Sequence, residues 1–390
     1  MSYKYPLATT TWDKSEYTAL QDVIATGLFT MGPKVAEFEA NFAGYTKSKY
    51  AVMVNSGSSA NLLIIAALFY TNNPKLRLRP GDEVIVPAVS WSTTYYPLYQ
   101  YGLKIKFVDI DLNTLNYDLK QLHEAVSNQT RVIMAVNLLG NPNDFDAIQN
   151  IIENKNILLI EDNCESLGAE FKGKLTGTFG VMGSFSTFFS HHISTMEGGV
   201  IVTENEELYH ILLSLRAHGW TRNLPKNNLV CGRKSENAFE ESFRFVLPGY
   251  NVRPLEMSGA IGIEQIKKIP ELINERRKNG KLIQKLMSTH PDLLIQTEIG
   301  NSSWFGFSLV IKPQSKLTPK KLIKYLEMSS IEYRPIVAGN FAKNEVVKYF
   351  NYEVFGNLKN AEYIDTHGLF IGNHHYSVSE MISRLIGISS

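Results

Sequence analysis

The segment from Asn55 to Asn61 has residue types that suit the binding of a phosphate group. It reads N-S-G-S-S-A-N and connects a hydrophobic stretch to a stretch with helical spacing. Free N–H groups at a helix start, serine hydroxyls and the positive end of the helix dipole all favour an anion. Similar small-residue turns also join strands to helices without binding anything, so this segment needs support from other signals.

A second segment, I-E-D-N-C-E-S from Ile160, places Asp162 at the end of a hydrophobic run. A carboxylate at the end of a buried strand could pair with a protonated ring nitrogen of a bound cofactor. It could equally cap the turn that follows. Both interpretations remain open at this point.

A third segment runs from Ser184 to Gly199 and reads S-F-S-T-F-F-S-H-H-I-S-T-M-E-G-G. It contains the histidine pair His191 and His192 between two stretches of strand-forming residues. An unperturbed imidazole has a pKa of about 6.5, so it can accept and donate a proton near neutral pH. The segment therefore offers a candidate for general acid–base chemistry.

The elements that must position these segments alternate between strand-like and helix-like patterns from about residue 50 to residue 203. This alternation predicts a mostly parallel sheet with helices on both faces, and parallel sheets bind ligands at the carboxyl ends of their strands. The predicted strands are Tyr50–Asn55, Glu83–Pro87, Lys104–Asp109, Val132–Asn137, Ile157–Asp162, Ser184–Phe189 and Val200–Thr203. The predicted helices are Asp13–Thr26, Val35–Tyr45, Asn61–Phe69, Leu119–Val126 and Phe145–Glu153.

Beyond residue 250 the pattern changes to a smaller α+β arrangement. We predict a large domain over residues 1–250, which includes an N-terminal arm, and a small domain over residues 251–390. The predicted elements of the small domain are a helix at Glu271–Ser288, a strand at Trp304–Lys312, a helix at Pro319–Met328 and a strand at Ile331–Arg334.

Composition narrows the class of partner. The 390 residues carry 39 basic and 38 acidic side chains, a formal charge of +1, so no overall field attracts nucleic acid or an anionic membrane. The N-terminus lacks a signal-peptide pattern, and the longest apolar run, Leu62 to Tyr70, is too short to span a bilayer. We expect a cytoplasmic protein with a small-molecule ligand. We also expect no metal, because the adjacent His374 and His375 would point to opposite faces of a strand.

Ordered sequence matches along nearly the whole chain identify a family resemblance. The matching segments are F-T-M-G-P-K-V-A-E-F-E from Phe29, N-S-G-S-S-A-N from Asn55, G-D-E-V-I-V-P-A from Gly81, F-V-D-I-D from Phe107, the histidine run, R-A-H-G-W from Arg216 and G-Y-N-V-R-P-L-E-M-S-G-A-I-G from Gly249. Together they resemble the DegT–StrS group of sugar aminotransferases and dehydratases. The resemblance implies the α/β fold of aspartate aminotransferase, PLP fold type I, where PLP is pyridoxal 5′-phosphate.

The resemblance also implies roles for individual positions. Gly57, Ser58 and Ser186 would bind the cofactor phosphate, Asp162 would pair with the ring nitrogen, Trp91 would stack on the ring, and Glu165 would touch the cofactor or its amino-acid adduct. Asn251 would reach the phosphate in a neighbouring subunit, which implies a homodimer with shared active sites. Trp91 could instead be a packing aromatic, and Asn251 a turn residue.

His191 occupies the position at which this family normally carries its cofactor-anchoring lysine. Imidazole cannot form a Schiff base with PLP, so PLP and its amine form, PMP, would be held noncovalently. Histidine retains proton transfer, which favours loss of a hydroxyl group over ordinary transamination. The S-H-H-I-S-T-M-E-G-G pattern resembles a histidine-bearing branch of the family, the sugar 3-dehydratases. An inactive relative, or an engineered replacement of the lysine, is the alternative.

Within that branch, Cys164 and Cys231 are the only cysteines, too few for a four-cysteine iron–sulfur cluster, so we expect no iron–sulfur reductase partner. The segments W-S-T-T-Y-Y-P from Trp91 and R-A-H-G-W-T-R-N-L-P from Arg216 resemble the GDP-sugar members. Their similarity implies glutamate-dependent removal of the C3 hydroxyl of GDP-4-keto-6-deoxy-D-mannose, giving GDP-4-keto-3,6-dideoxymannose, on a route to GDP-colitose and the lipopolysaccharide O-antigen.

Further substrate contacts are expected from basic side chains near the site. His218 could contact the amino-acid adduct, and Arg222 and Arg253 could bind the glutamate carboxylates or the nucleotide diphosphate. Each could instead be a structural partner within the fold. A nucleotide-sugar aminotransferase and a non-catalytic binding protein with the same fold are the alternative functions.

Overall fold

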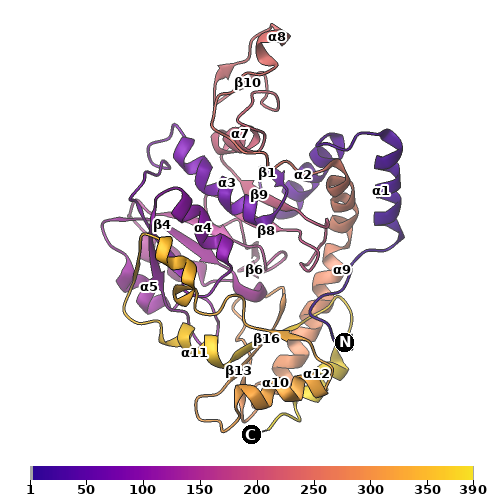
Figure 1. Ribbon diagram of the computed structural model, residues 1–390, viewed down its shortest axis with the longest axis vertical. Helices are drawn as coiled ribbons and strands as arrows, with labels where there is room; N and C mark the ends of the chain where they lie inside the picture. Colours follow the sequence, from indigo (N-terminus) through magenta and orange to yellow (C-terminus); the bar gives the residue numbers. More distant parts are fainter. Residues whose placement is uncertain (1–2, 390) are drawn as a thin grey trace.

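The large sheet dominates the computed structural model, which describes residues 3–389 (Figure 1). In spatial order its strands are β1 (Tyr50–Val54), β9 (Gly199–Thr203), β8 (Gly183–Ser186), β5 (Leu158–Asp162), β4 (Thr130–Val136), β2 (Glu83–Pro87), β3 (Lys104–Val108) and β15 (Tyr352–Val354). The pairings from β8 to β15 are parallel, whereas β9 is antiparallel to both β1 and β8. The mostly parallel sheet predicted from the sequence is therefore confirmed.

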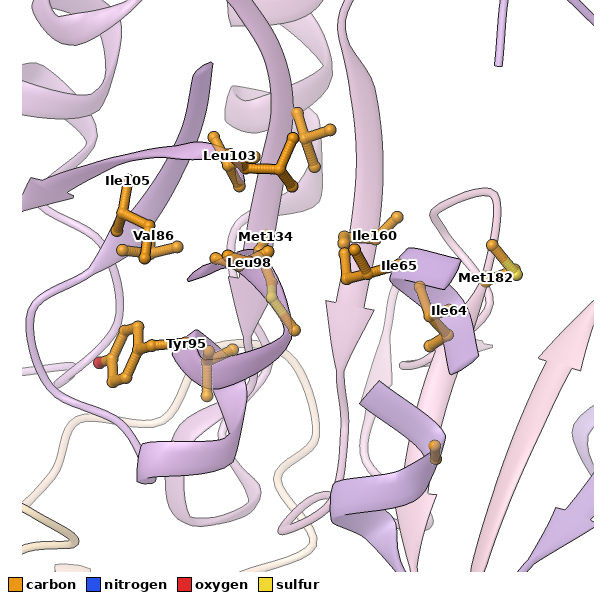
Figure 2. Packing of buried hydrophobic residues seen from close by; sticks show 14 of the residues in the cluster. Ile64, Ile65, Val86, Tyr95, Leu98, Leu103, Ile105, Met134, Ile160 and Met182 are labelled. Atoms are coloured by element: carbon orange, nitrogen blue, oxygen red, sulfur yellow. The ribbon is translucent and has the colours of Figure 1, made fainter. Parts of the chain in front are cut away.

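Helices cover both faces of this sheet because successive side chains of a strand pack into two different hydrophobic clusters, one on each face. Val84 and Val86 of β2 pack in one cluster with α3 (Gly57–Tyr70), α4 (Ser92–Gln100) and α7 (Glu206–Leu215). Ile85, between them, packs in another cluster with α5 (Leu119–Ala125) and α6 (Phe145–Ile152). Side chains of successive strand residues point to opposite faces, which produces this division. Figure 2 shows Ile64, Tyr95 and Leu98 of the first cluster near strand residues of the sheet.

The small domain is built on a second sheet with its own core. The strands are β12 (Leu293–Leu294), β13 (Gly306–Ile311), β16 (Gly368–Gly372) and β14 (Tyr333–Arg334), in that order and all antiparallel. The accompanying helices are α10 (Pro319–Met328), α11 (Lys359–His367) and α12 (Ser379–Leu385). Between these helices, β15 leaves the small domain and pairs with β3 of the large sheet. The boundary at residues 250 and 251 stays a prediction.

Helix α9 (Glu256–Met287) connects the two sheets and begins fifteen residues earlier than the sequence predicted. Pro270 and the glycines before it lie inside this helix. The glycines allow close packing against α2 (Pro33–Thr46), because a Cβ on Gly262 would lie 2.5 Å from the Phe38 ring. The same region packs against α1 (Lys14–Thr26), which Asp13 and Gly27 cap at its two ends.

The predicted strand Ser184–Phe189 is too long at its end, since β8 stops at Ser186. Residues 187–198 form a closed loop in which the Phe189 amide donates to the Met196 carbonyl and the Thr195 amide to the Thr187 carbonyl. This loop carries His191. Two short elements elsewhere, β6 (Glu170–Phe171) and β7 (Lys174–Leu175), form a separate hairpin.

A narrow projection extends from the large domain beyond α7, at the top of Figure 1. It contains β10 (Asn227–Asn228), β11 (Gly232–Arg233) and α8 (Ala238–Glu241). Across residues 3–389, no helix is long and apolar enough to cross a membrane.

Candidate active site

A pocket lies where strand ends of the large sheet meet residues of the small domain. The large domain contributes the N-termini of α3 and α4 and the residues at and after the ends of β5 and β8. The small domain contributes Phe305, Arg334 and Val337. Six of the predicted site residues, Gly57, Ser58, Trp91, Asp162, Glu165 and Ser186, line it together with His191. Within the described chain, no lysine side chain lines this pocket.

The helix start predicted to bind phosphate opens into the pocket. Ser56 caps α3 by accepting a hydrogen bond from the Ser59 amide, so Gly57 and Ser58 form the first turn. The Ser58 hydroxyl donates to the Thr93 hydroxyl at 2.9 Å. Gly57 must lack a side chain, because a Cβ there would lie 2.7 Å from the Ser186 Cβ and 2.9 Å from the Cys164 Sγ. The strand end at Ser186 therefore packs directly against the helix start.

Asp162 uses its two carboxylate oxygens differently. Oδ1 accepts the Cys164 amide at 3.2 Å, the turn-capping contact that the sequence left open. Oδ2 accepts the Asn61 amide group and the Thr94 hydroxyl, each at 2.8 Å. The residue is only 6% exposed and lines the pocket. Asp162 thus caps its turn and also presents a fixed negative charge to the pocket.

Trp91 is the N-cap residue of α4 and is 57% exposed. A packing aromatic would be buried, so the exposure of Trp91 at the pocket favours a ligand-facing role. Glu165, in contrast, is partly buried and accepts the Leu139 amide at 3.1 Å. Burial raises the pKa of Glu165, and the nearby positive charge of Arg334 opposes this rise.

His191 lies in the pocket beside aromatic rings. Its ring centroid is 5.1 Å from that of Phe305 and 6.1 Å from that of Phe188. Its Nδ1 is buried and has no hydrogen-bond partner among the described residues. Burial lowers the pKa of His191 to about 3, and the positive charges of Arg334 and Arg276 add to this effect. This shift favours the neutral imidazole, whereas the sequence analysis started from the unperturbed pKa of about 6.5.

The remaining predicted residues lie together outside this pocket. His218, Arg222 and Arg253 surround Trp220, with distances to its ring centroid of 4.7 Å from the His218 ring, 4.8 Å from the Arg222 guanidinium carbon and 5.8 Å from that of Arg253. The Arg253 Nε donates to the side chain of Asn251 at 3.0 Å. None of these side chains lines the pocket of the single chain, although the Asn55 amide donates to the Val252 carbonyl at 3.0 Å, and their predicted contacts stay predictions.

Sequence reasoning missed Arg334, Phe305 and the partners of Asp162. Asn61 belongs to the predicted phosphate-binding motif, and its position one helical turn after Gly57 could have placed it near the strand ends. Arg334 ends a predicted strand but lies 143 residues beyond His191. No local pattern connects the two. The Nε of Arg334 is buried and unpartnered among the described residues, although its guanidinium group lies 4.5 Å from the Phe370 ring centroid.

Comparison with known proteins agrees with this geometry. The model of the DegT/DnrJ/EryC1/StrS aminotransferase family matches residues 10–388. The GDP-4-keto-6-deoxy-D-mannose 3-dehydratase of Yersinia pseudotuberculosis is 60% identical over 385 residues, which cover 98% of each chain.

Solved structures of similar enzymes extend the agreement to the fold. The E. coli GDP-4-keto-6-deoxy-D-mannose-3-dehydratase with bound hydrated PLP is 60% identical, with a TM-score of 0.97 and coverage of 99% of this chain and 100% of that chain. A structure of GDP-4-keto-6-deoxymannose-3-dehydratase with a trapped PLP-glutamate geminal diamine is also 60% identical, with a TM-score of 0.96 and coverage of 98% and 100%. The fold is PLP fold type I, as expected, and the chain belongs to the DegT/DnrJ/EryC1/StrS aminotransferase family.

Proposed function

We propose that this chain is a PLP-dependent lyase that removes the C3 hydroxyl group of GDP-4-keto-6-deoxy-D-mannose and uses L-glutamate as its co-substrate. The observation that carries the proposal is the position of His191. It lines the pocket at the point where the family carries its lysine, and its Nδ1 has no partner among the described residues. Relatives that share the whole length of the chain are named for this reaction.

The pocket residues fit PLP held without a covalent bond. The phosphate would lie at the start of α3 against Ser58 and Ser186, where the first-turn amides of the helix have no intrahelical partner. Asp162 would hold the ring nitrogen in its protonated form, and Trp91 would cover the ring. When bound, PLP supplies an electron sink for bond cleavage at the attached substrate carbon.

The neutral imidazole of His191 is suited to act first as a base. It would take a proton from the C4′ carbon of the cofactor and return it to the departing C3 hydroxyl. Glutamate supplies the two hydrogens that the sugar needs, since the sugar and glutamate give the 3-deoxy sugar, 2-oxoglutarate and ammonia. Because no lysine lines the described pocket, nothing there would retain the cofactor through a covalent bond.

Arg334 is the best partner for a glutamate carboxylate. Its Nε is buried, unpartnered among the described residues and part of a side chain that lines the pocket. A guanidinium group can bind a carboxylate through parallel hydrogen bonds. Glu165, on the same side of the pocket as Asp162, would lie next to the cofactor and its amino group.

The partner subunit of a homodimer would complete the site. Phe239 on the projection is 87% exposed, and Phe243 and Phe245 are also exposed. Such an apolar surface favours burial against another protein. Arg222 and Arg253 lie at the base of the projection and form no ion pair among the described residues. They would bind the diphosphate of the sugar nucleotide in the pocket of the other subunit. Asn251 would reach the cofactor phosphate in that same pocket. Replacing Phe239 and Phe243 with serine should shift the sedimentation coefficient from that of a dimer to that of a monomer.

The function can be tested with purified protein, PLP, L-glutamate and GDP-4-keto-6-deoxy-D-mannose. A dehydratase releases ammonia and 2-oxoglutarate and forms a 3-deoxy-4-keto sugar, detectable by mass spectrometry. A stable amino sugar would instead identify an aminotransferase, and the absence of turnover would favour a binding protein.

The variant His191→Lys tests the role of the histidine itself. We expect it to lose dehydration and to form a covalent PLP adduct that borohydride reduces. A variant that kept full dehydratase activity would contradict the assignment of His191 as the base.

A further inference from the structure

The loop that carries His191 positions its imidazole without a hydrogen bond to the ring. The Nδ1 of His191 has no partner among the described residues, and the backbone amide of His191 donates only to the nearby Phe188 carbonyl at 2.9 Å. The location of the ring therefore depends on its packing against Phe188 and Phe305 and on how the backbone of residues 190–196 is held. A base that is misplaced by about 1 Å can lose roughly a hundredfold in rate.

Two residues that are distant in the sequence hold both backbone polar groups of Ser194, three positions after His191. The indole Nε1 of Trp12 donates to the Ser194 carbonyl at 3.0 Å. The Ser194 amide donates to the Oε1 of Gln265 at 3.0 Å. Trp12 precedes α1 and Gln265 lies within α9, so the N-terminal arm and the long helix meet at this loop.

Gln265 is fully buried and uses all of its hydrogen-bonding capacity. Its Oε1 also accepts the Thr11 hydroxyl at 2.6 Å, and its Nε2 donates to the Thr11 carbonyl at 3.3 Å and to the Glu16 carboxylate at 2.7 Å. A buried amide with every partner satisfied specifies one orientation, since rotation would leave polar groups unpaired. The Ser194 amide is therefore tied to a rigid point of the fold.

We propose that Gln265 and Trp12 are positioning residues that hold the loop of residues 190–196 so that His191 faces the reacting atoms. The proposal rests on the proposed dehydratase function for its activity measurements. The N-terminal arm then has a role in catalysis although neither residue lines the pocket.

The test compares Gln265→Met, which keeps the length of the side chain, and Trp12→Phe, which keeps an aromatic ring. We expect Gln265→Met to lower kcat about 10- to 100-fold and Trp12→Phe about 3- to 10-fold, with KM for glutamate and for the sugar nucleotide changed less than about 3-fold. Both variants should also speed hydrogen–deuterium exchange in peptides that span residues 190–196, measured by mass spectrometry without substrates. The double variant should lose less than the product of the single losses, because both act through Ser194.

Thr9→Val is the matched control. Thr9 lies on the same arm, but its hydroxyl group contacts Nδ1 of His374 at 3.2 Å and not the loop. Its kcat and its loop exchange should match the wild type. If Gln265→Met does not fold, the partly exposed Trp12 decides the question through Trp12→Phe alone.

Unchanged exchange in the loop, or faster exchange with a wild-type kcat, would overturn the proposal. A parallel rise in both KM values with constant kcat would also overturn it, since that pattern reports lost binding and not a misplaced base. If the wild-type protein itself had no dehydratase activity, the proposed function would fail. The exchange measurement would then still show whether Gln265 and Trp12 hold the loop.

Discussion

Gly57→Ala is the substitution whose effect the structure defines most sharply. The added Cβ would lie 2.7 Å from the Ser186 Cβ and 2.9 Å from the Cys164 Sγ. Both neighbours have short side chains that cannot swing away. Their backbone is held by the sheet, since Ser186 ends β8 and Cys164 follows β5. The start of α3 must therefore move away from the strand ends. Such overpacking typically costs about 1–3 kcal/mol.

This movement occurs at the proposed phosphate site, so it should appear as weaker cofactor binding. A loss of about 1.4–2.8 kcal/mol corresponds to a 10- to 100-fold rise in the Kd for PLP. The measurement is a titration of the apoprotein with PLP that follows quenching of tryptophan fluorescence, to which Trp91 in the same pocket contributes. Thermal unfolding with and without PLP provides a second measure, since a ligand that binds the native state raises its Tm.

Gly44→Ala is the matched control for this experiment. Gly44 lies within α2, and a Cβ there would have no atom within 4 Å. The change should leave the Kd for PLP unaltered and stabilise the helix by about 0.5–1 kcal/mol. If Gly57→Ala folded normally and bound PLP with wild-type affinity, the phosphate would not lie at the start of α3, and the proposed cofactor orientation would be wrong.

Further predictions concern the charged groups of the pocket. Arg334→Met should raise KM for glutamate about 10- to 100-fold, because a hydrogen bond to a charged group contributes roughly 1.5–3 kcal/mol. The Kd for PLP should stay nearly constant. An equal loss of affinity for glutamate and for PLP would contradict a carboxylate-binding role. Acid should destabilise the protein through His191, whose folded pKa of about 3 lies below its unfolded value, so that only the unfolded state takes up this proton as the pH falls below about 6.5. Urea unfolding between pH 7 and pH 5 should therefore show a smaller pH dependence for His191→Asn than for the wild type, by up to about 1.4 kcal/mol per pH unit; identical slopes would show that the histidine is not buried as a neutral group.

The sequence predicted the residues that stand at strand ends because one physical rule brings them together. Asp162 and Ser186 end neighbouring parallel strands, and Gly57 begins the helix after a third strand of the same sheet. Strand ends of a parallel sheet share one edge, so the predicted strands placed these segments at the same edge of the sheet, and the family resemblance selected the residues within them. The family resemblance then assigned a role to each.

The residues that the sequence did not predict depend on long-range packing. Arg334 reaches the pocket only because β14 joins the small sheet, and the small sheet follows a helix that begins fifteen residues before the predicted start. β15 is three residues long, too short for a pattern of alternation to stand out. The low pKa of His191 has the same origin, since burial and the charges of Arg334 and Arg276 come from other parts of the chain.

The burial of His191 and the positive charges near it bear on the order of proton transfers in the proposed reaction. A neutral imidazole can remove a proton, but burial and the positive charges of Arg334 and Arg276 would disfavour the protonated form of His191. The protonated form is therefore a strong acid that must pass its proton on, and a departing hydroxyl group next to it is a suitable acceptor. A lysine at this position would instead bond to the cofactor. The positive charges around His191 thus favour rapid return of the proton to the sugar, which is the step that completes the loss of water.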